Sequence, residues 1–161
     1  MDLKRIARHL FSSSRAFPDK ALAAIERAIA NSEATHRGEI RFAAEDALDS
    51  PALFGGQSAR ERAIEVFSQL RVWDTEENNG VLIYLLVADR DLEIVADRGI
   101  SARVTPAEWE SICRGVEQAL ARGAYEQAIV DGIKEISLLL AQHYPPRPGG
   151  RNELPDKPMV L

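Results

Sequence analysis

The sequence lacks the features of several common protein classes. Its 161 residues include a single cysteine, Cys113, which excludes an internal disulfide bond and fits a reducing compartment. Basic residues are not in excess, because the formal net charge is -5. Since phosphate binding needs clustered Lys and Arg, we expect no nucleic acid among the partners of this protein.

Long hydrophobic runs are absent as well. The longest, Val81–Ala88, has far too few residues to cross a bilayer. The first residues are charged and no long apolar core follows them, so we expect no signal peptide and a cytoplasmic protein. Residues 3–11 have the pattern of an amphipathic helix, with Lys4, Arg5 and Arg8 on its polar side. Such a helix could contact a membrane surface weakly, or it could pack on its own domain.

Motifs for phosphate loops and zinc sites are also missing. The glycines do not form a Gly-rich phosphate loop. His9, His36 and His143 are scattered and do not have the spacing of zinc ligands. Any prediction of a site therefore depends on the carboxylates.

What the sequence does contain is enough for one folded domain. Hydrophobic residues make up 45% of the chain, which favours a domain with a real core over disorder. Two helices have capping boxes at their first residues, one formed by Ser58 and Glu61 and one by Thr105 and Glu108. The second of these helices is expected to end at Gly123.

An apolar stripe runs along the helix that follows Thr105. Its members recur at helical spacing: Trp109, Cys113, Val116 and Leu120. We therefore predict that Trp109 and Cys113 are buried core residues without a catalytic role.

Three segments have the patterns of β-strands. Residues 38–45 alternate apolar and charged side chains, which predicts a half-buried strand. Val81–Ala88 is apolar on both faces, which predicts a central strand. Leu92–Asp97 follows too closely for a crossover, so this strand is expected to be antiparallel to Val81–Ala88. A helix separates the first two strands, which favours a parallel pair.

The order of these elements predicts the fold class. Helix, helix, strand, helix, strand, strand, helix and helix indicate an α/β fold, a three-layer α/β/α sandwich with a small mixed sheet and helices on both faces. We expect one domain over residues 1–144, including the N-terminal amphipathic helix. Residues 145–161 are rich in Pro and Gly and are expected to form an extended C-terminal tail.

Carboxylates are expected at both ends of this sheet. Where the first two strands end, Asp89 and Asp91 lie near Glu45 and Asp46. Asp side chains bond nearby backbone amides and tolerate turn geometry, so Asp89 and Asp91 are predicted to shape the hairpin turn.

The opposite rim of the sheet has more oxygen donors, namely Glu39, Asp74, Glu76, Glu77, Asn78, Asn79 and Asp97. Such hard oxygen ligands suit Ca²⁺ or Mg²⁺. We predict a weak metal site formed by Asn79, Asp97, Glu39 and Glu77. A solvated acidic rim that holds no ion is the alternative.

Another alternative comes from the apolar strand that ends in Asp89-Arg90-Asp91. It resembles the nucleophile strand of haloacid-dehalogenase-type phosphatases, in which the first Asp attacks phosphorus and Mg²⁺ screens the charge. The context differs, because Leu92 starts another strand where that family needs a loop and a helix. The downstream Gly-Asp-x-x-x-Asp of such sites is also missing.

A broader resemblance covers nearly the whole chain. The stretch NNGVLIYLLVADRDLEIVADRGI, preceded by ARERAIEVFSQL and followed by RGAYEQAIVDGI, resembles the TPM domain family over about residues 18–143. The motifs that carry this resemblance are Asn79-Gly80, Asp89-Arg90, Gly99, Trp109, and Gly123 with Tyr125. The segments GEIR and VADRGI are similar to the soluble bacterial branch of the family.

The resemblance implies an α/β/α sandwich and several roles. These are thylakoid-lumen photosystem repair, receptor modulation and acid phosphatase activity, with divalent-ion binding at loop carboxylates. We therefore favour a TPM-family accessory protein that binds Ca²⁺ or Mg²⁺ weakly at the acidic rim and acts through contacts with an unknown protein partner. The alternative is a metal-dependent acid phosphatase that uses the same rim, although the sequence identifies no catalytic residue.

Overall fold

The computed structural model describes residues 2–12 and 16–161. Over these residues the chain forms seven helices and four strands. In chain order they are α1 (Leu3–Leu10), α2 (Asp19–Glu33), β1 (Glu39–Glu45), α3 (Ser50–Phe54), α4 (Ala59–Gln69), β2 (Gly80–Leu86), β3 (Asp91–Ala96), α5 (Arg98–Ser101), α6 (Pro106–Ala121), α7 (Tyr125–His143) and β4 (Met159–Val160).

The four strands form one mixed sheet in the order β3-β2-β1-β4. β1 pairs parallel with β2, and β2 pairs antiparallel with β3, which confirms the predicted strand directions. β4 was not predicted. It pairs parallel with β1 through Met159 and Val160, so the end of the expected C-terminal tail forms an edge strand of the sheet.

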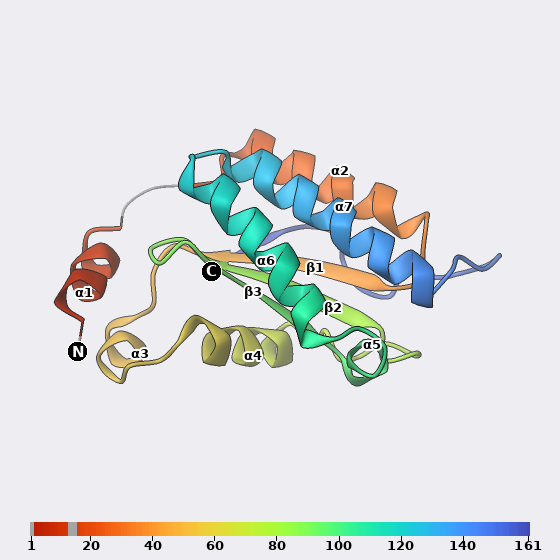
Figure 1. Ribbon diagram of the computed structural model, residues 1–161, viewed down its shortest axis with the longest axis horizontal. Coiled ribbons are helices and arrows are strands. Elements are labelled where there is room, and N and C mark those ends of the chain that lie inside the picture. The colour runs from red at the N-terminus through yellow and green to blue at the C-terminus, as the bar shows by residue number, and fades with distance from the viewer. Residues whose placement is uncertain (1, 13–15) are drawn as a thin grey trace.

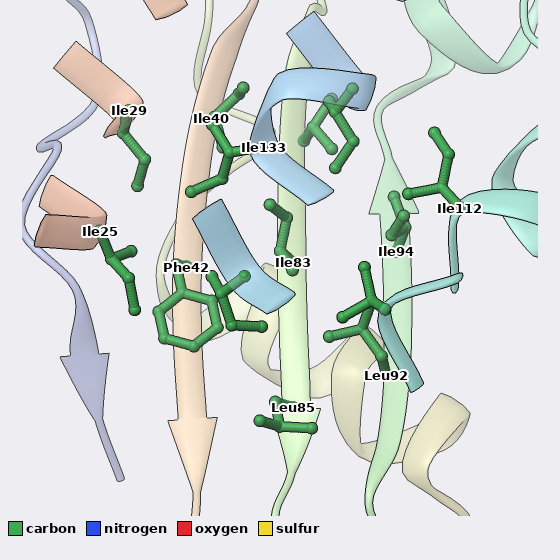
Figure 2. Packing of buried hydrophobic residues seen from close by; sticks show 14 of the residues in the cluster. Ile25, Ile29, Ile40, Phe42, Ile83, Leu85, Leu92, Ile94, Ile112 and Ile133 are labelled. Carbon is green, nitrogen blue, oxygen red and sulfur yellow. The ribbon is translucent and has the colours of Figure 1, made fainter. Parts of the chain in front are cut away.

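Helices cover both faces of the sheet, which confirms the predicted α/β/α sandwich (Figure 1). On one face α2, α6 and α7 pack on side chains such as Phe42, Ile83 and Leu85 (Figure 2). On the other face the side chains of α4 pack on Leu82 and Tyr84. Within the described part of the chain, no helix has the length and apolar character needed to span a bilayer.

Local sequence signals set the first residues of two of the helices that cover the sheet, α4 and α6. The capping boxes of Ser58 with Glu61 and of Thr105 with Glu108 are both formed, as predicted. Gly123 follows the end of α6 with φ of 81°, a left-handed conformation that glycine adopts without steric cost.

The prediction that the first strand is half-buried is wrong. All seven residues of β1 are buried, including the three charged ones, Glu39, Arg41 and Glu45. The reason is that other segments cover the charged face. Glu39 Oε2 accepts hydrogen bonds from the backbone nitrogens of residues 153 and 154, Arg41 Nη1 donates to the carbonyls of residues 155 and 157, and Glu45 accepts from Arg62 of α4.

The predicted full burial of Trp109 and Cys113 is also wrong. The buried residues of α6 are Ile112, Val116 and Leu120, whereas Trp109 and Cys113 are only partly buried against the core. Both lie on the side of the helix that faces a groove beside β3. Burial nevertheless raises the pKa of the Cys113 thiol to about 12, so the thiol is protonated at neutral pH.

Candidate functional site

A cleft of about 990 Å³ opens at the end of the sheet where β1 and β2 begin. Its walls are the end of α2, the loop before β2, and the segment that runs from Pro146 to Asp156. Three of the four predicted metal ligands line this cleft, namely Glu39, Glu77 and Asn79. The structure therefore brings together most of the rim that the sequence predicts.

Carboxylates repel one another in this cleft. Burial, with smaller contributions from the charges of Glu39 and Asp156, raises the pKa of Glu33 to about 9, although a hydrogen bond from Ile40 N opposes the change. Burial also raises the pKa of Glu39 to about 7, and the charges of Glu153 and Asp156 add to the effect. Two backbone N–H groups bonded to Glu39 offset only part of it.

Arginines occupy part of the same cleft. Arg37 forms an ion pair with Glu77, and Arg147 Nη1 lies 3.4 Å from Glu77 Oε1. Glu77 is therefore already neutralised, whereas Glu33 and Glu39 have no such partner among the ion pairs of the described residues.

Asn79 lines the cleft and has one side-chain oxygen without a hydrogen-bond partner in the described residues. Its Nδ2 donates to the Arg37 carbonyl at 2.5 Å, and its side chain is 2% exposed. Its Oδ1 is buried and has no hydrogen-bond partner in the described residues. Burying an acceptor without a donor costs free energy of folding. A water molecule that donates a hydrogen bond, or a cation that this oxygen coordinates, would offset that cost.

Asp97 lies outside the lining of the cleft. It caps α5, accepting a hydrogen bond from Arg98 N at 2.7 Å with Oδ1, while its Oδ2 is buried and unpaired in the described residues. Among residues 2–12 and 16–161, no three His, Cys, Asp or Glu side chains form a group that could hold a metal ion. The four-residue metal site thus stays a prediction.

The acids at the other end of the sheet have different partners. Arg5 Nε and Arg8 Nη2 donate to Asp89 at 2.8 and 2.9 Å, and His9 Nε2 lies 3.1 Å from it. Burial alone would raise the pKa of Asp89, but these bonds outweigh burial and lower it. The prediction that Asp89 bonds nearby turn amides is therefore wrong, because its partners lie on α1. The left-handed residue of the turn is Arg90, with φ of 53°.

The family of the chain is shown by a match over most of its length. A family model described as the TPM domain matches residues 11–138. The chain belongs to the TPM domain family.

The structure of this TPM domain is also similar to solved structures. The NMR structure of the BA42 protein from the psychrophilic bacterium Bizionia argentinensis has a TM-score of 0.80 and 29% sequence identity, and the match covers 90% of this chain and 95% of that one. The N-terminal domain of a P. gingivalis protein has a TM-score of 0.63 at 15% identity, with coverage of 86% and 92%, and shows the fold alone. No curated protein matches the chain.

Several residues of the cleft in this TPM domain were not found by sequence reasoning. Glu33 lies at the end of a helix and Asp156 in the expected tail, and both enter the cleft because residues 153–157 fold back on β1. Arg147 also lies in the expected tail, and Arg37 lies shortly before β1, where the sequence shows no sign of a site. The only signal in the sequence is the charged alternation of residues 38–45, which marks polar groups that need partners.

Proposed function

We propose that this TPM-domain protein is an accessory protein that binds a divalent cation weakly in the cleft and acts through contacts with a protein partner. The observation that carries the proposal is the buried Oδ1 of Asn79, which is unpaired in the described residues and belongs to a residue that lines the cleft together with Glu39 and Glu77. Hard oxygen donors of this kind suit Ca²⁺ or Mg²⁺.

The charges of the cleft support this proposal and explain why binding should be weak. Burial is the main cause of the raised pKa values of Glu33 and Glu39, and a cation would relieve the smaller contribution of the neighbouring carboxylates. Arg37 and Arg147 compete with it for Glu77. We therefore expect a dissociation constant on the order of 10⁻⁴ M or above.

Thermal unfolding with and without Ca²⁺ or Mg²⁺ at pH 8 tests the proposal. A cation at ten times its dissociation constant stabilises the folded state by about 1.4 kcal/mol, which raises the midpoint by a few degrees. Glu39→Gln should remove this increase. Asp89→Asn, at the opposite end of the sheet, should keep it. An unchanged midpoint in the wild type, or loss of the increase in Asp89→Asn alone, would contradict the proposal.

Asp97→Asn decides where the cation lies. Asp97 Oδ2 is buried and unpaired but is not part of the cleft lining. If Asp97→Asn removes the increase in the midpoint and Glu39→Gln does not, the cation binds beside Asp97, where β3 ends and α5 begins, instead of in the cleft.

The alternative function, a metal-dependent acid phosphatase, has one supporting observation. Phosphoryl oxygens need positive groups, and Arg37, Arg147 and Arg151 line the cleft. Turnover of a simple phosphate monoester in the presence of Mg²⁺, lost in Arg37→Ala, would replace the accessory role with this one.

A cytoplasmic location belongs to the same proposal. Its support is the free thiol of Cys113, which suits a reducing compartment. Fractionation of cells that express the protein from its own promoter would test it.

We also propose the weak membrane contact through residues 3–11. α1 docks on the domain through Arg5, His9 and the partly buried Ile6. Leu3, Leu10 and Phe11 are 74%, 55% and 83% exposed. An exposed apolar edge next to Lys4 suits an anionic lipid surface. Sedimentation with anionic vesicles, lost in Leu3→Ser/Phe11→Ser, tests this contact.

A further inference from the structure

β3 is an edge strand of the sheet (Figure 2). Asp97 N donates to Gly80 O, and the register pairs Val95 with Leu82. In an antiparallel ladder the residues that bond across alternate with those that do not. The backbone groups of Leu92, Ile94 and Ala96 therefore point away from β2, toward the open edge.

Side chains bond these outward-pointing groups in place of a fifth strand. Leu92 N donates to Glu117 Oε1 at 3.2 Å, and Ile94 O accepts from Arg60 Nη1 at 2.6 Å. Ala96 O accepts from Ser101 Oγ at 3.0 Å. An incoming strand would replace these side-chain bonds with main-chain bonds.

A groove of about 560 Å³ follows this edge, between β3 and α6. Its lining includes the apolar side chains of Leu92, Val104 and Trp109. Trp109 and Cys113 are thus the part of α6 that faces the groove, which accounts for their incomplete burial. The groove offers apolar contacts beside a row of backbone bonding groups, as grooves that bind extended peptides do.

The groove is acidic. Its lining contains four carboxylates, Asp91, Glu93, Glu110 and Glu117, and two arginines, Arg60 and Arg114. Burial raises the pKa of Asp91, of Glu93 and of Glu117, and in each case a neighbouring carboxylate raises it further. The arginines thus leave negative charge uncompensated. A segment that carries Lys or Arg would neutralise it, whereas pairing of β3 with β3 of a second copy would double it.

We propose that the groove between β3 and α6 binds an extended, Lys- or Arg-containing segment of a partner protein, which adds as a fifth strand on the edge of β3 that faces away from β2 and displaces the side chains bonded there. This surface is separate from the carboxylate-lined cleft. Because peptide binding requires no cation, the two proposals can fail independently.

An NMR titration of the ¹⁵N-labelled protein at low ionic strength tests the proposal. The probe is a capped peptide of alternating Lys and Val, compared with a Glu-Val peptide and with the Lys-Val peptide N-methylated along its bonding edge. We expect shifts and slower hydrogen exchange at the Leu92, Ile94 and Ala96 amides with the unmodified Lys-Val peptide only. Equal binding of the methylated peptide would show attraction of charge without strand addition and would overturn the proposal.

Two variants separate the contribution of main-chain hydrogen bonds to peptide binding from the contribution of charge. Ala96→Pro removes an N–H that faces the groove and leaves the β2 ladder intact, so affinity should fall about fivefold or more in a variant whose spectrum is otherwise native. Glu93→Gln/Glu117→Gln should weaken binding about threefold or more, whereas Glu135→Gln, on the exposed side of α7, should not. Binding that Ala96→Pro and Glu93→Gln/Glu117→Gln both leave unchanged, or β3 shifts that depend on protein concentration without peptide, would overturn the proposal.

Discussion

Acidic residues at the two ends of the sheet have different surroundings. Where β1 and β2 end, Glu45 accepts hydrogen bonds from Arg62 and from the Tyr84 hydroxyl, and Asp89 accepts them from Arg5 and Arg8. Where the same strands begin, Glu33 and Glu39 lie near other carboxylates, and their pKa values rise to about 9 and about 7.

This difference separates structural acids from candidate functional ones. An acid that is bonded to cations stabilises the fold in its charged form, and its pKa is lowered, as for Asp89. An acid that is buried near like charges destabilises its own charged form, and such groups gather at functional sites. Glu33 and Glu39 are therefore candidate ligands, whereas Asp89 has a structural role. Asp91 lies at the same end as Asp89, but burial and the charge of Asp89 raise its pKa, so position at one end of the sheet does not by itself decide the role of an acid.

The largest expected effect is at Glu45. Replacement by Ala leaves the buried Tyr84 hydroxyl without a partner and leaves the Arg62 guanidinium with only the exposed Glu65, which should cost about 3–5 kcal/mol. Urea unfolding at pH 7 measures it. Glu65→Ala is the matched control, because Glu65 pairs with the same arginine at 3.1 Å but is 51% exposed. A cost no larger than that of Glu65→Ala would show that Glu45 is not a structural acid.

The next effect concerns pH at the other end of the sheet. The pKa of Glu33 is about 9 in the folded protein against 4.5 in the unfolded chain. Between pH 4.5 and 9, Glu33 is protonated in the folded protein and ionised in the unfolded chain. The contribution of Glu33 to the free energy of unfolding is therefore present at low pH and is lost as the pH rises through 9. The free energy of unfolding should therefore fall between pH 6.5 and 9, by up to about 3 kcal/mol.

His36 sets the lower limit of that measurement. Burial lowers its pKa to about 4 from 6.5, so its contribution to stability rises with pH up to 6.5 and opposes that of Glu33 there. Above pH 6.5 the decline should be smaller in Glu33→Gln and unchanged in Glu26→Gln, an exposed acid on the same helix. A decline of the same size in Glu33→Gln would show that Glu33 does not cause this pH dependence.

The sequence predicted five of the seven helices and three of the four strands of the described residues because their signals are local. It did not predict the short helices α3 and α5. Capping boxes, helical stripes and the two-sided apolar run of β2 each depend on neighbouring residues. β4 could not be found in this way. It has only two residues, and its partner β1 lies more than a hundred residues earlier in the chain.

The errors at β1 and Asp89 have the same origin. The alternation of Glu39 and Arg41 with apolar residues is the usual sign of a solvent-facing side, yet the returning C-terminal segment supplies the hydrogen-bond partners that bury them. Asp89 likewise has partners on α1 that lie more than eighty residues away. Acids were thus placed at the correct ends of the sheet, whereas the partners that decide their roles depend on long-range contacts.

The smallest expected effect is the loosening of α1 in Asp89→Asn. The ion pairs with Arg5 and Arg8 are partly exposed, so their loss should cost about 1 kcal/mol and change global stability little. The effect should be local, because Asp89 joins α1 to the hairpin turn and His9 Nδ1 accepts a hydrogen bond from Leu48 N at 3.0 Å. Hydrogen exchange should become about fivefold faster at the Leu48 amide and in α1, while the β2 amides keep their protection. Asp46→Asn changes the charge by the same amount at the same end of the sheet and should leave both unchanged. If Asp89→Asn instead weakens the protection of β2, then Asp89 supports the sheet itself, and the contrast between the two ends extends to the core.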